Sequence, residues 1–235
     1  MTVFQLVLRS LLSRKRTVAL ALVALAPAVF LTLRLAFNAD APEVYARVME
    51  RIFLPTSTAF VALVLGVSAL GDQRDDGTIL YLAATPLRRV VLVGQATLAA
   101  WAATLVLVVP SAVACILVSG IADATLAFWT LVAVVLVAGA YVAAFGWLAL
   151  RTRRPVVFGF LYILLWEGSI ASFAASASKL SIGAYSRAVM ARAVPGAPRF
   201  NVPSISAVPA VVVLVLVALG GVLLAGRSFT RAELP

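Results

Sequence analysis

The sequence predicts an all-α polytopic membrane protein with six transmembrane helices, an N-terminal amphipathic interface helix and a short cytoplasmic helix between the second and third spans. Of the 235 residues, 63% are hydrophobic and 12% are charged, whereas soluble domains carry about 25% charged residues. The apolar residues gather in charge-free runs, and about 20 such residues span a bilayer as a helix. Lys and Arg residues stand at the ends of these runs, as in membrane proteins.

Residues 1–16 predict an amphipathic helix that lies in the membrane interface. Phe4, Val7, Leu8 and Leu11 fall on one helical face, and Gln5, Arg9, Ser13 and Arg16 fall on the other. Its cations are Arg9, Arg14, Lys15 and Arg16. The alternative is the start of a signal peptide cleaved at Ala39-Asp40-Ala41, which Pro42 disfavours.

The predicted spans are residues 17–37, 52–71, 86–118, 124–150, 155–175 and 207–226. The first reaches spanning length if Arg34 extends toward the headgroups. The third begins at Pro86 and is bent by Pro110, because its charge-free run of 33 residues is too long for one span and too short for two. Residues 38–51 predict a loop with one helical turn after Pro42. Ser119, Gly120 and Asp123 predict the turn before the fourth span.

The long segment 176–206 is mixed in character and predicts an extracytoplasmic connection. Its first half allows a short amphipathic helix, which Pro195-Gly196-Ala197-Pro198 ends.

The distribution of basic residues predicts how the protein is oriented in the membrane. Six spans place both termini on one side, and twelve of the nineteen Lys and Arg residues then share that side. The positive-inside rule makes this side cytoplasmic, which predicts a multi-pass protein of the cell membrane. The same bias accounts for the net charge of +10 without a nucleic-acid partner.

Several kinds of chemistry are absent from the residue inventory. The chain has no histidine and one cysteine, Cys115, so neither a Ser/His/Asp set nor a zinc site can be assembled. Neither lysine follows glycine or precedes Ser or Thr in a phosphate-binding loop. We therefore expect no catalytic residues, no metal site and no cofactor in this chain.

The most informative polar segment is 72–85, with the residues that follow it to Arg89. Asp75 and Asp76 form an acidic lead, Gly77 breaks the preceding turn, and Thr78 is suited to cap a short helix. Ile79 and Leu82 lie one turn apart on that helix. Pro86 suits the first turn of the next span, and Arg88 marks the membrane surface. Such a helix can dock into a partner's groove; the alternative is a loop that lies on the headgroups.

Residues 71–95 resemble the corresponding region of type-2 ABC transporter permeases. The similarity lies in Asp75-Asp76-Gly77-Thr78-Ile79-Leu80, in Ala84-Thr85-Pro86-Leu87 and in Gly94-Gln95. The six-span layout, the N-terminal helix and the long outer segment also look like that family. Leu80 stands where the family usually has Glu, and Gln95 where Lys is common.

The resemblance implies a permease subunit that pairs with a second copy, as a homodimer or a heterodimer. Each copy would dock a separate ATP-binding subunit, which binds ATP and Mg²⁺, through a cytoplasmic coupling helix. The residues implied in this coupling are Asp75, Asp76, Gly77, Thr78, Ile79, Leu82, Pro86 and Arg88. The N-terminal helix would brace the same surface.

Glu167 is the one acid inside a predicted span. A carboxylate at membrane depth is costly and usually faces a cavity or a partner. The functional interpretation is a residue that lines the cargo path or latches a gate by pairing with Arg34, Lys179 or Arg187. In the structural interpretation, Glu167 caps the outer part of the span in the turn at Gly168-Ser169. Tyr162 is expected to anchor the helix at the membrane interface or to pack against other side chains.

Three functions remain open from the sequence. The first is the ABC permease, which would export a lipid-like or amphipathic cargo, since the spans hold few polar residues. The second is a channel or scaffold without ATP coupling. The third is an intramembrane enzyme using Asp75, Asp76 and Glu167, which the lack of histidine disfavours.

Overall fold

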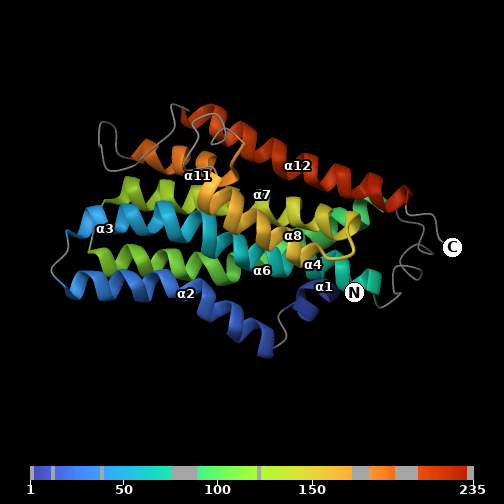
Figure 1. Ribbon diagram of the computed structural model, residues 1–235, viewed down its shortest axis with the longest axis horizontal. Helices are drawn as coiled ribbons and strands as arrows, with labels where there is room; N and C mark the ends of the chain where they lie inside the picture. The colour runs from blue at the N-terminus through green and yellow to red at the C-terminus, as the bar shows by residue number, and fades with distance from the viewer. Residues whose placement is uncertain are drawn as a thin grey trace.

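The computed structural model describes residues 3–11, 14–37, 40–75, 89–120, 123–170, 180–193 and 206–231. These residues form an elongated helical bundle without a strand among them (Figure 1). In chain order the helices are α1 (Val3–Leu11), α2 (Arg14–Ala36), α3 (Ala41–Val48), η1 (Met49–Ser57), α4 (Thr58–Asp75), α6 (Arg89–Ser119), α7 (Ala124–Arg151), α8 (Pro155–Leu161), η2 (Tyr162–Ile170), α11 (Ile182–Met190), η3 (Ala191–Ala193) and α12 (Ala207–Arg231).

Within these ranges, five helices are long and apolar enough to cross a membrane. They comprise α2, the continuous run from α3 to α4, then α6, α7 and α12. The fifth predicted span, 155–175, is represented by α8 and η2 in its described part, and its apolar helix, Pro155–Gly168, is shorter than the five helices above. The described part of the chain therefore has the multi-pass helical architecture of a membrane-embedded protein.

The loop predicted over residues 38–51, with one helical turn after Pro42, is wrong from Ala41 onward, because helix runs from Ala41 without a break into α4. The middle of this run, η1, is wound as a π-helix and contains Pro55. Proline has no N–H to donate to the helix, and backbone bonds in a π-helix run from residue i to residue i+5. The helix continues past Pro55 with this winding, and the Thr56 hydroxyl donates to the Arg51 carbonyl oxygen over 3.4 Å.

Helix α2 contains Pro27 and bends between its two halves (Figure 1). The proline leaves the Val23 carbonyl without its helical donor. The Ser57 hydroxyl of η1 donates to this oxygen over 2.8 Å, and the Ser111 hydroxyl of α6 donates to the neighbouring Ala24 carbonyl. Two neighbouring helices thus supply donors at the bend.

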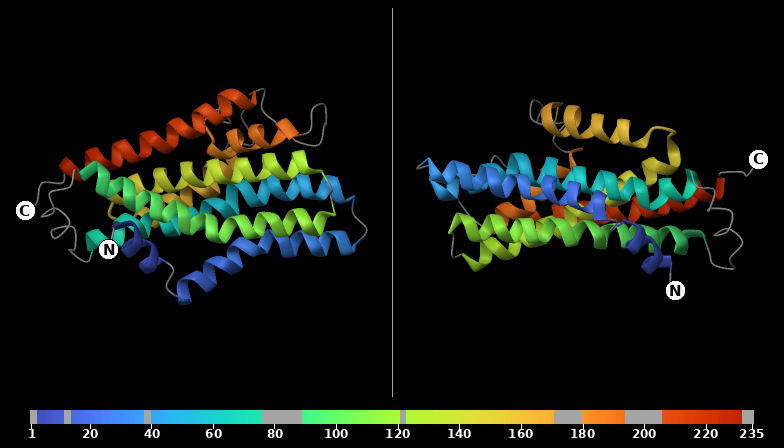
Figure 2. Two further views of the ribbon diagram at one scale, coloured as in Figure 1. Left: turned by 180° about the vertical axis from the view of Figure 1, so that it is seen from behind. Right: turned by 90° about the horizontal axis from the view of Figure 1, so that it is seen from below.

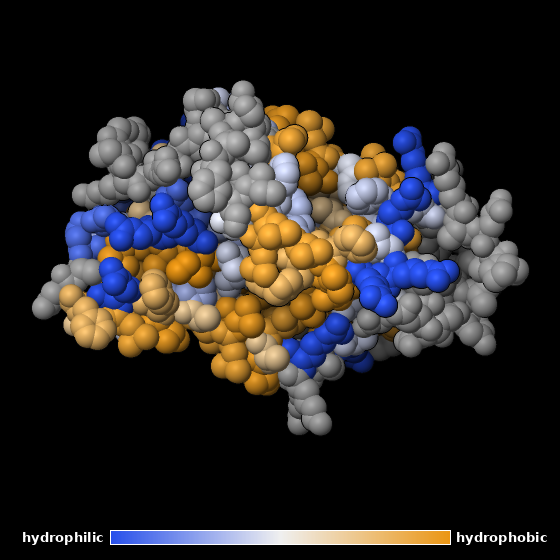
Figure 3. All heavy atoms as spheres, viewed as in Figure 1, coloured by the Kyte–Doolittle hydropathy of each residue, from blue (hydrophilic) through white to orange (hydrophobic). Residues whose placement is uncertain are grey.

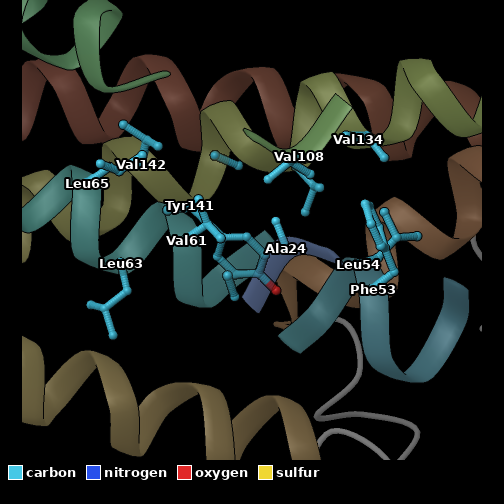
Figure 4. Close-up of a cluster of buried hydrophobic side chains, with 14 of the residues drawn as sticks. Ala24, Phe53, Leu54, Val61, Leu63, Leu65, Val108, Val134, Tyr141 and Val142 are labelled. Atoms are coloured by element: carbon cyan, nitrogen blue, oxygen red, sulfur yellow. The ribbon is translucent and has the colours of Figure 1, made fainter. Parts of the chain in front are cut away.

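Helix α7 is the central element, packed between α4 and α12. Glycines allow the close approach. A Cβ on Gly66 of α4 would lie 3.0 Å from the Val142 carbonyl oxygen, and one on Gly221 of α12 would lie 2.8 Å from the Ala143 carbonyl carbon. Small residues at such crossings let backbones pack closely in membrane proteins. Figure 4 shows Tyr141 of α7 among the aliphatic side chains of this core.

The described residues between α6 and α7 are Gly120, which directly follows α6, and Asp123, which directly precedes α7. Gly120 has φ of 66°, in the left-handed region that favours glycine. Asp123 caps α7 by accepting from the Thr125 amide at 2.8 Å and the Leu126 amide at 3.3 Å. The turn predicted at Ser119, Gly120 and Asp123 is present.

The outer helices expose much of their apolar surface. Large hydrophobic residues are exposed along α2, α6, α8 and α12. Figure 3 shows hydrophobic side chains across the middle of the molecule and hydrophilic side chains toward both ends. A surface of this kind is suited to a bilayer, whose hydrocarbon lies between two polar zones.

Candidate functional site

Both chain ends gather at one end of the bundle. Figures 1 and 2 place α1, the C-terminal end of α12, the end of α4 and the start of α6 together there. The α7–α8 turn, with exposed Arg151, Arg153 and Arg154, belongs to the same end. We call it the terminal end; it is the end that the charge count predicts to be cytoplasmic.

Helix α1 has one buried face and one exposed face. Val7 and Leu11 are buried against neighbouring helices, among them α6 and α4, whereas Gln5 and Arg9 are exposed. The predicted place of this helix in a membrane interface stays a prediction. Among the other predicted cations, Arg14 and Lys15 belong to the first turn of α2. Arg16 donates to the Ser68 hydroxyl of α4, which ties the start of α2 to α4.

Most of the predicted coupling residues lie outside the described residues. Asp75 is the last residue of α4, so this helix extends beyond the predicted end of the second span at residue 71. Asp76, Gly77, Thr78, Ile79, Leu82, Pro86 and Arg88 all fall within 76–88, between the ends of α4 and α6. The structure does describe the two helices that flank this segment: α4 ends and α6 begins at the terminal end (Figure 1).

Glu167 lies in the π-helix η2 and is only 6% exposed. Its Oε1 accepts a hydrogen bond from the Tyr162 hydroxyl over 3.0 Å. Residues five apart in a regular α-helix point about 140° away from each other, whereas π-winding follows an i to i+5 pattern. The π-winding of η2 therefore brings the tyrosine and the carboxylate onto one face.

The same carboxylate meets the N-terminus of α11. The Ser181 hydroxyl donates to Oε2 of Glu167 over 2.5 Å, and the Gly183 amide donates to Oε1 over 3.2 Å. Ser181 is also the N-cap of α11, since its oxygen accepts from the Ala184 amide at 3.0 Å. The positive end of a helix dipole stabilises a carboxylate. These contacts offset part of the cost of burying Glu167.

The carboxylate can approach this closely because Gly183 has no side chain. A Cβ at this position would lie 2.7 Å from Oε2 of Glu167 and 3.1 Å from Cβ of Pro55 in η1. Three segments therefore converge around the carboxylate: η2, the start of α11 and the proline of η1. We call Glu167, Tyr162, Ser181 and Gly183 the carboxylate junction.

Two further polar side chains face the carboxylate junction from α7 and α11. The Tyr141 hydroxyl lies close enough to Glu167 for their charges to interact, but no hydrogen bond of normal geometry joins them. Within the described parts of the chain, this hydroxyl and Nε of Arg187 are both buried without a hydrogen-bond partner. Buried donors without partners are uncommon in folded proteins.

The far end of α11 is also fixed to α7. The Arg192 guanidinium of η3 lies 5.1 Å from the ring centroid of Trp129, a distance at which a cation and an aromatic ring attract. Helix α11, most of which is buried, thus contacts the bundle at its start, and η3 contacts α7 at the other end through Arg192.

The predicted partners of Glu167 differ from the observed ones. Among the described residues the carboxylate is bound by two hydroxyls and one amide, and not by Arg34 or Arg187. Lys179 lies outside these residues. Glu167 is inside a π-helix instead of in a turn at Gly168-Ser169. The sequence did not predict that the Tyr162 hydroxyl bonds to Glu167. A signal was present for the other partners, because a serine at position 181 is typical of the start of a capped helix.

Metal-binding residues do not cluster in the part of the chain that the structure describes. The single thiol, Cys115, is buried in α6 without a disulfide partner there. The arrangement around Glu167 is therefore suited to holding helices together, or to receiving a polar group, through hydrogen bonds.

No protein-family model matches this chain, and no curated protein matches it.

Proposed function

We propose that this chain is the membrane-spanning permease subunit of an ABC transporter in the cytoplasmic membrane. A separate ATP-binding subunit would bind ATP and Mg²⁺ and would dock at the terminal end. A second permease copy, identical or related, would complete the transporter. The cargo would be lipid-like or amphipathic and would be exported.

The observation that carries this proposal is the composition of the terminal end. It gathers α1, both chain ends, the α7–α8 turn and the helices that flank residues 76–88 (Figure 2). That segment holds most of the sequence that resembles the coupling region of type-2 permeases. Its acidic lead and the apolar pair Ile79 and Leu82 give a partner both charge and an apolar contact. The positive-inside rule favours the cytoplasm for this end.

The carboxylate junction adds a candidate moving part to the proposal. Export requires the membrane helices to change their packing when the ATP-binding subunits close. Glu167 joins η2 to α11 through a few hydrogen bonds, and such bonds can exchange for bonds to cargo or water. We propose that this junction opens during transport, with Glu167 as the latch.

ATP coupling can be tested with an ABC-type ATP-binding protein from the same genome. The two proteins are reconstituted together, and ATP hydrolysis is compared with and without the permease. The double variant Ile79→Asp/Leu82→Asp should abolish the permease-dependent hydrolysis and co-purification. The control Phe37→Asp/Leu180→Asp adds the same charge at exposed apolar positions and should leave both unchanged.

A channel or scaffold without ATP coupling is the alternative outcome of that experiment. It would show as ATP hydrolysis that does not respond to the permease, with no co-purification in the unaltered pair. Equal losses in the test and control variants would also contradict a docking role for residues 79 and 82.

The latch is tested with Glu167→Gln, which keeps the side-chain shape. We expect export to fall while the amount of protein in the membrane stays near normal, because the neutral amide binds α11 differently without emptying the site. Equal losses of export and of protein would show that Glu167 serves folding alone.

A further inference from the structure

A groove of about 260 Å³ opens between α2 and the continuous α3–η1 helix. It lies at the opposite end from the chain termini, where α2 and α3 run side by side (Figure 1). Its lining combines apolar residues with three arginines: Phe30, Val44, Val48, Ile52, Arg34, Arg47 and Arg51. Apolar and cationic groups in one groove fit a ligand that has both an apolar and an anionic part.

The position of the groove along the bundle can be derived from helical rise. The bond from Arg16 to the Ser68 hydroxyl sets α2 and α4 level at the terminal end. From that level, Arg34 is about 27 Å away along α2 and Arg51 is about 26 Å away along the second helix. A bilayer's hydrocarbon core is about 30 Å thick. Arg34 and Arg51 therefore stand at the second membrane–water boundary.

The groove carries net positive charge. Arg47 forms an exposed ion pair with Glu43, one helical turn earlier. Within the described ranges, the side chains of Arg34 and Arg51 have neither an ion pair nor a hydrogen bond. Phe30 lies one turn from Arg34 toward the middle of the membrane and is 44% exposed. The cations thus occupy the headgroup side and the aromatic ring the hydrocarbon side.

We infer that this groove binds an anionic phospholipid of the leaflet at the end opposite the termini. The phosphate would lie between Arg34 and Arg51, and an acyl chain would follow Phe30 and the exposed apolar face of α2, which includes Val29 and Leu33. Guanidinium groups recognise phosphate through paired hydrogen bonds. A soluble anion would satisfy the arginines but would leave the apolar half of the groove uncovered.

Lipid retention measured by native mass spectrometry tests this site. The purified full chain is mixed with dioleoyl phosphatidylglycerol or with dioleoyl phosphatidylcholine, and the bound fraction is compared. Two arginines near a membrane surface correspond to a preference of about thirtyfold for the anionic lipid. Arg34→Gln/Arg51→Gln should lose this preference, whereas Arg34→Lys/Arg51→Lys should retain most of it.

The matched control is Arg153→Gln/Arg154→Gln, which removes the same charge from exposed positions at the terminal end. It should keep the preference. Equal retention of both lipids by the unaltered protein would overturn the inference, as would an equal loss in the control. Displacement of the lipid by millimolar glycerol phosphate would also overturn it, because it would define a site for soluble anions.

Discussion

Two junctions of this bundle are built in opposite ways. Helices α4 and α12 meet α7 through glycines, with backbone against backbone at Gly66 and Gly221. Helix η2 meets α11 through one buried carboxylate and its hydrogen-bond donors. In a bilayer, close packing and polar bonds both drive helix association. The difference indicates that α4, α7 and α12 form a closely packed frame, to which α11 also belongs by its packing, whereas η2 is joined to α11 through one polar side chain.

The largest expected effect is the loss of the carboxylate itself. Glu167→Leu leaves the Tyr162 and Ser181 hydroxyls and the Gly183 amide without an acceptor. We expect the protein to lose about 3 kcal/mol of stability or more. Thermal unfolding in detergent measures this, and hydrogen exchange should rise first in α11.

The control for this change is Glu43→Leu. It removes an acid that is half exposed and paired only with Arg47, and exposed ion pairs contribute about 0–1 kcal/mol. If Glu167→Leu were no more damaging than Glu43→Leu, the carboxylate junction would not hold α11 in place.

The closely packed frame is tested at two adjacent glycines of α12. A Cβ on Gly221 would lie within 2.9 Å of three atoms of Ala143, whereas a Cβ on Gly220 meets nothing within 4 Å. Gly221→Ala should lower stability by about 1–3 kcal/mol, because backbone atoms of α7 cannot move aside. Gly220→Ala should change stability by less than about 1 kcal/mol. Similar unfolding midpoints for the two variants would contradict the close contact.

The smallest expected effect concerns the bend of α2. Ser57→Ala removes the donor to the Val23 carbonyl, which should cost about 1 kcal/mol. In a Pro27→Ala background the new amide can donate to that carbonyl, so the same serine change should cost less. A double-mutant cycle of thermal unfolding checks this, and equal costs in both backgrounds would exclude compensation for the proline.

Much of the frame could be predicted from the sequence, because long apolar runs in a bilayer can only be helices. The turn at Gly120 and Asp123 could be predicted from its residue types. The helix through 41–51 could not, because the charged residues Arg47, Glu50 and Arg51 are typical of a loop. The helix expected from residue 52 is present, and its proline, Pro55, lies in the π-wound part.

The candidate site was predicted only in part. Glu167 was identified by its charge at membrane depth, a local property of the sequence. Its partners depend on π-winding, which brings Tyr162 alongside, and on the return of the chain, which brings Ser181 and Gly183 to it. Neither is encoded in residue spacing alone. Arg34 and Arg51 likewise line one groove only because α2 packs against η1, and the spacing of the two residues in the sequence does not show this packing.

The most direct test of the proposed function is photocrosslinking in cells from position 79. A benzoylphenylalanine at Ile79 should form a crosslink to the ATP-binding subunit that the proposed function requires. The same residue at exposed Phe37 should form none, because Phe37 directly follows the end of α2, and this end lies opposite the terminal end (Figure 1). A crosslink from Phe37 alone, or from neither position, would contradict the account of an ATP-coupled permease.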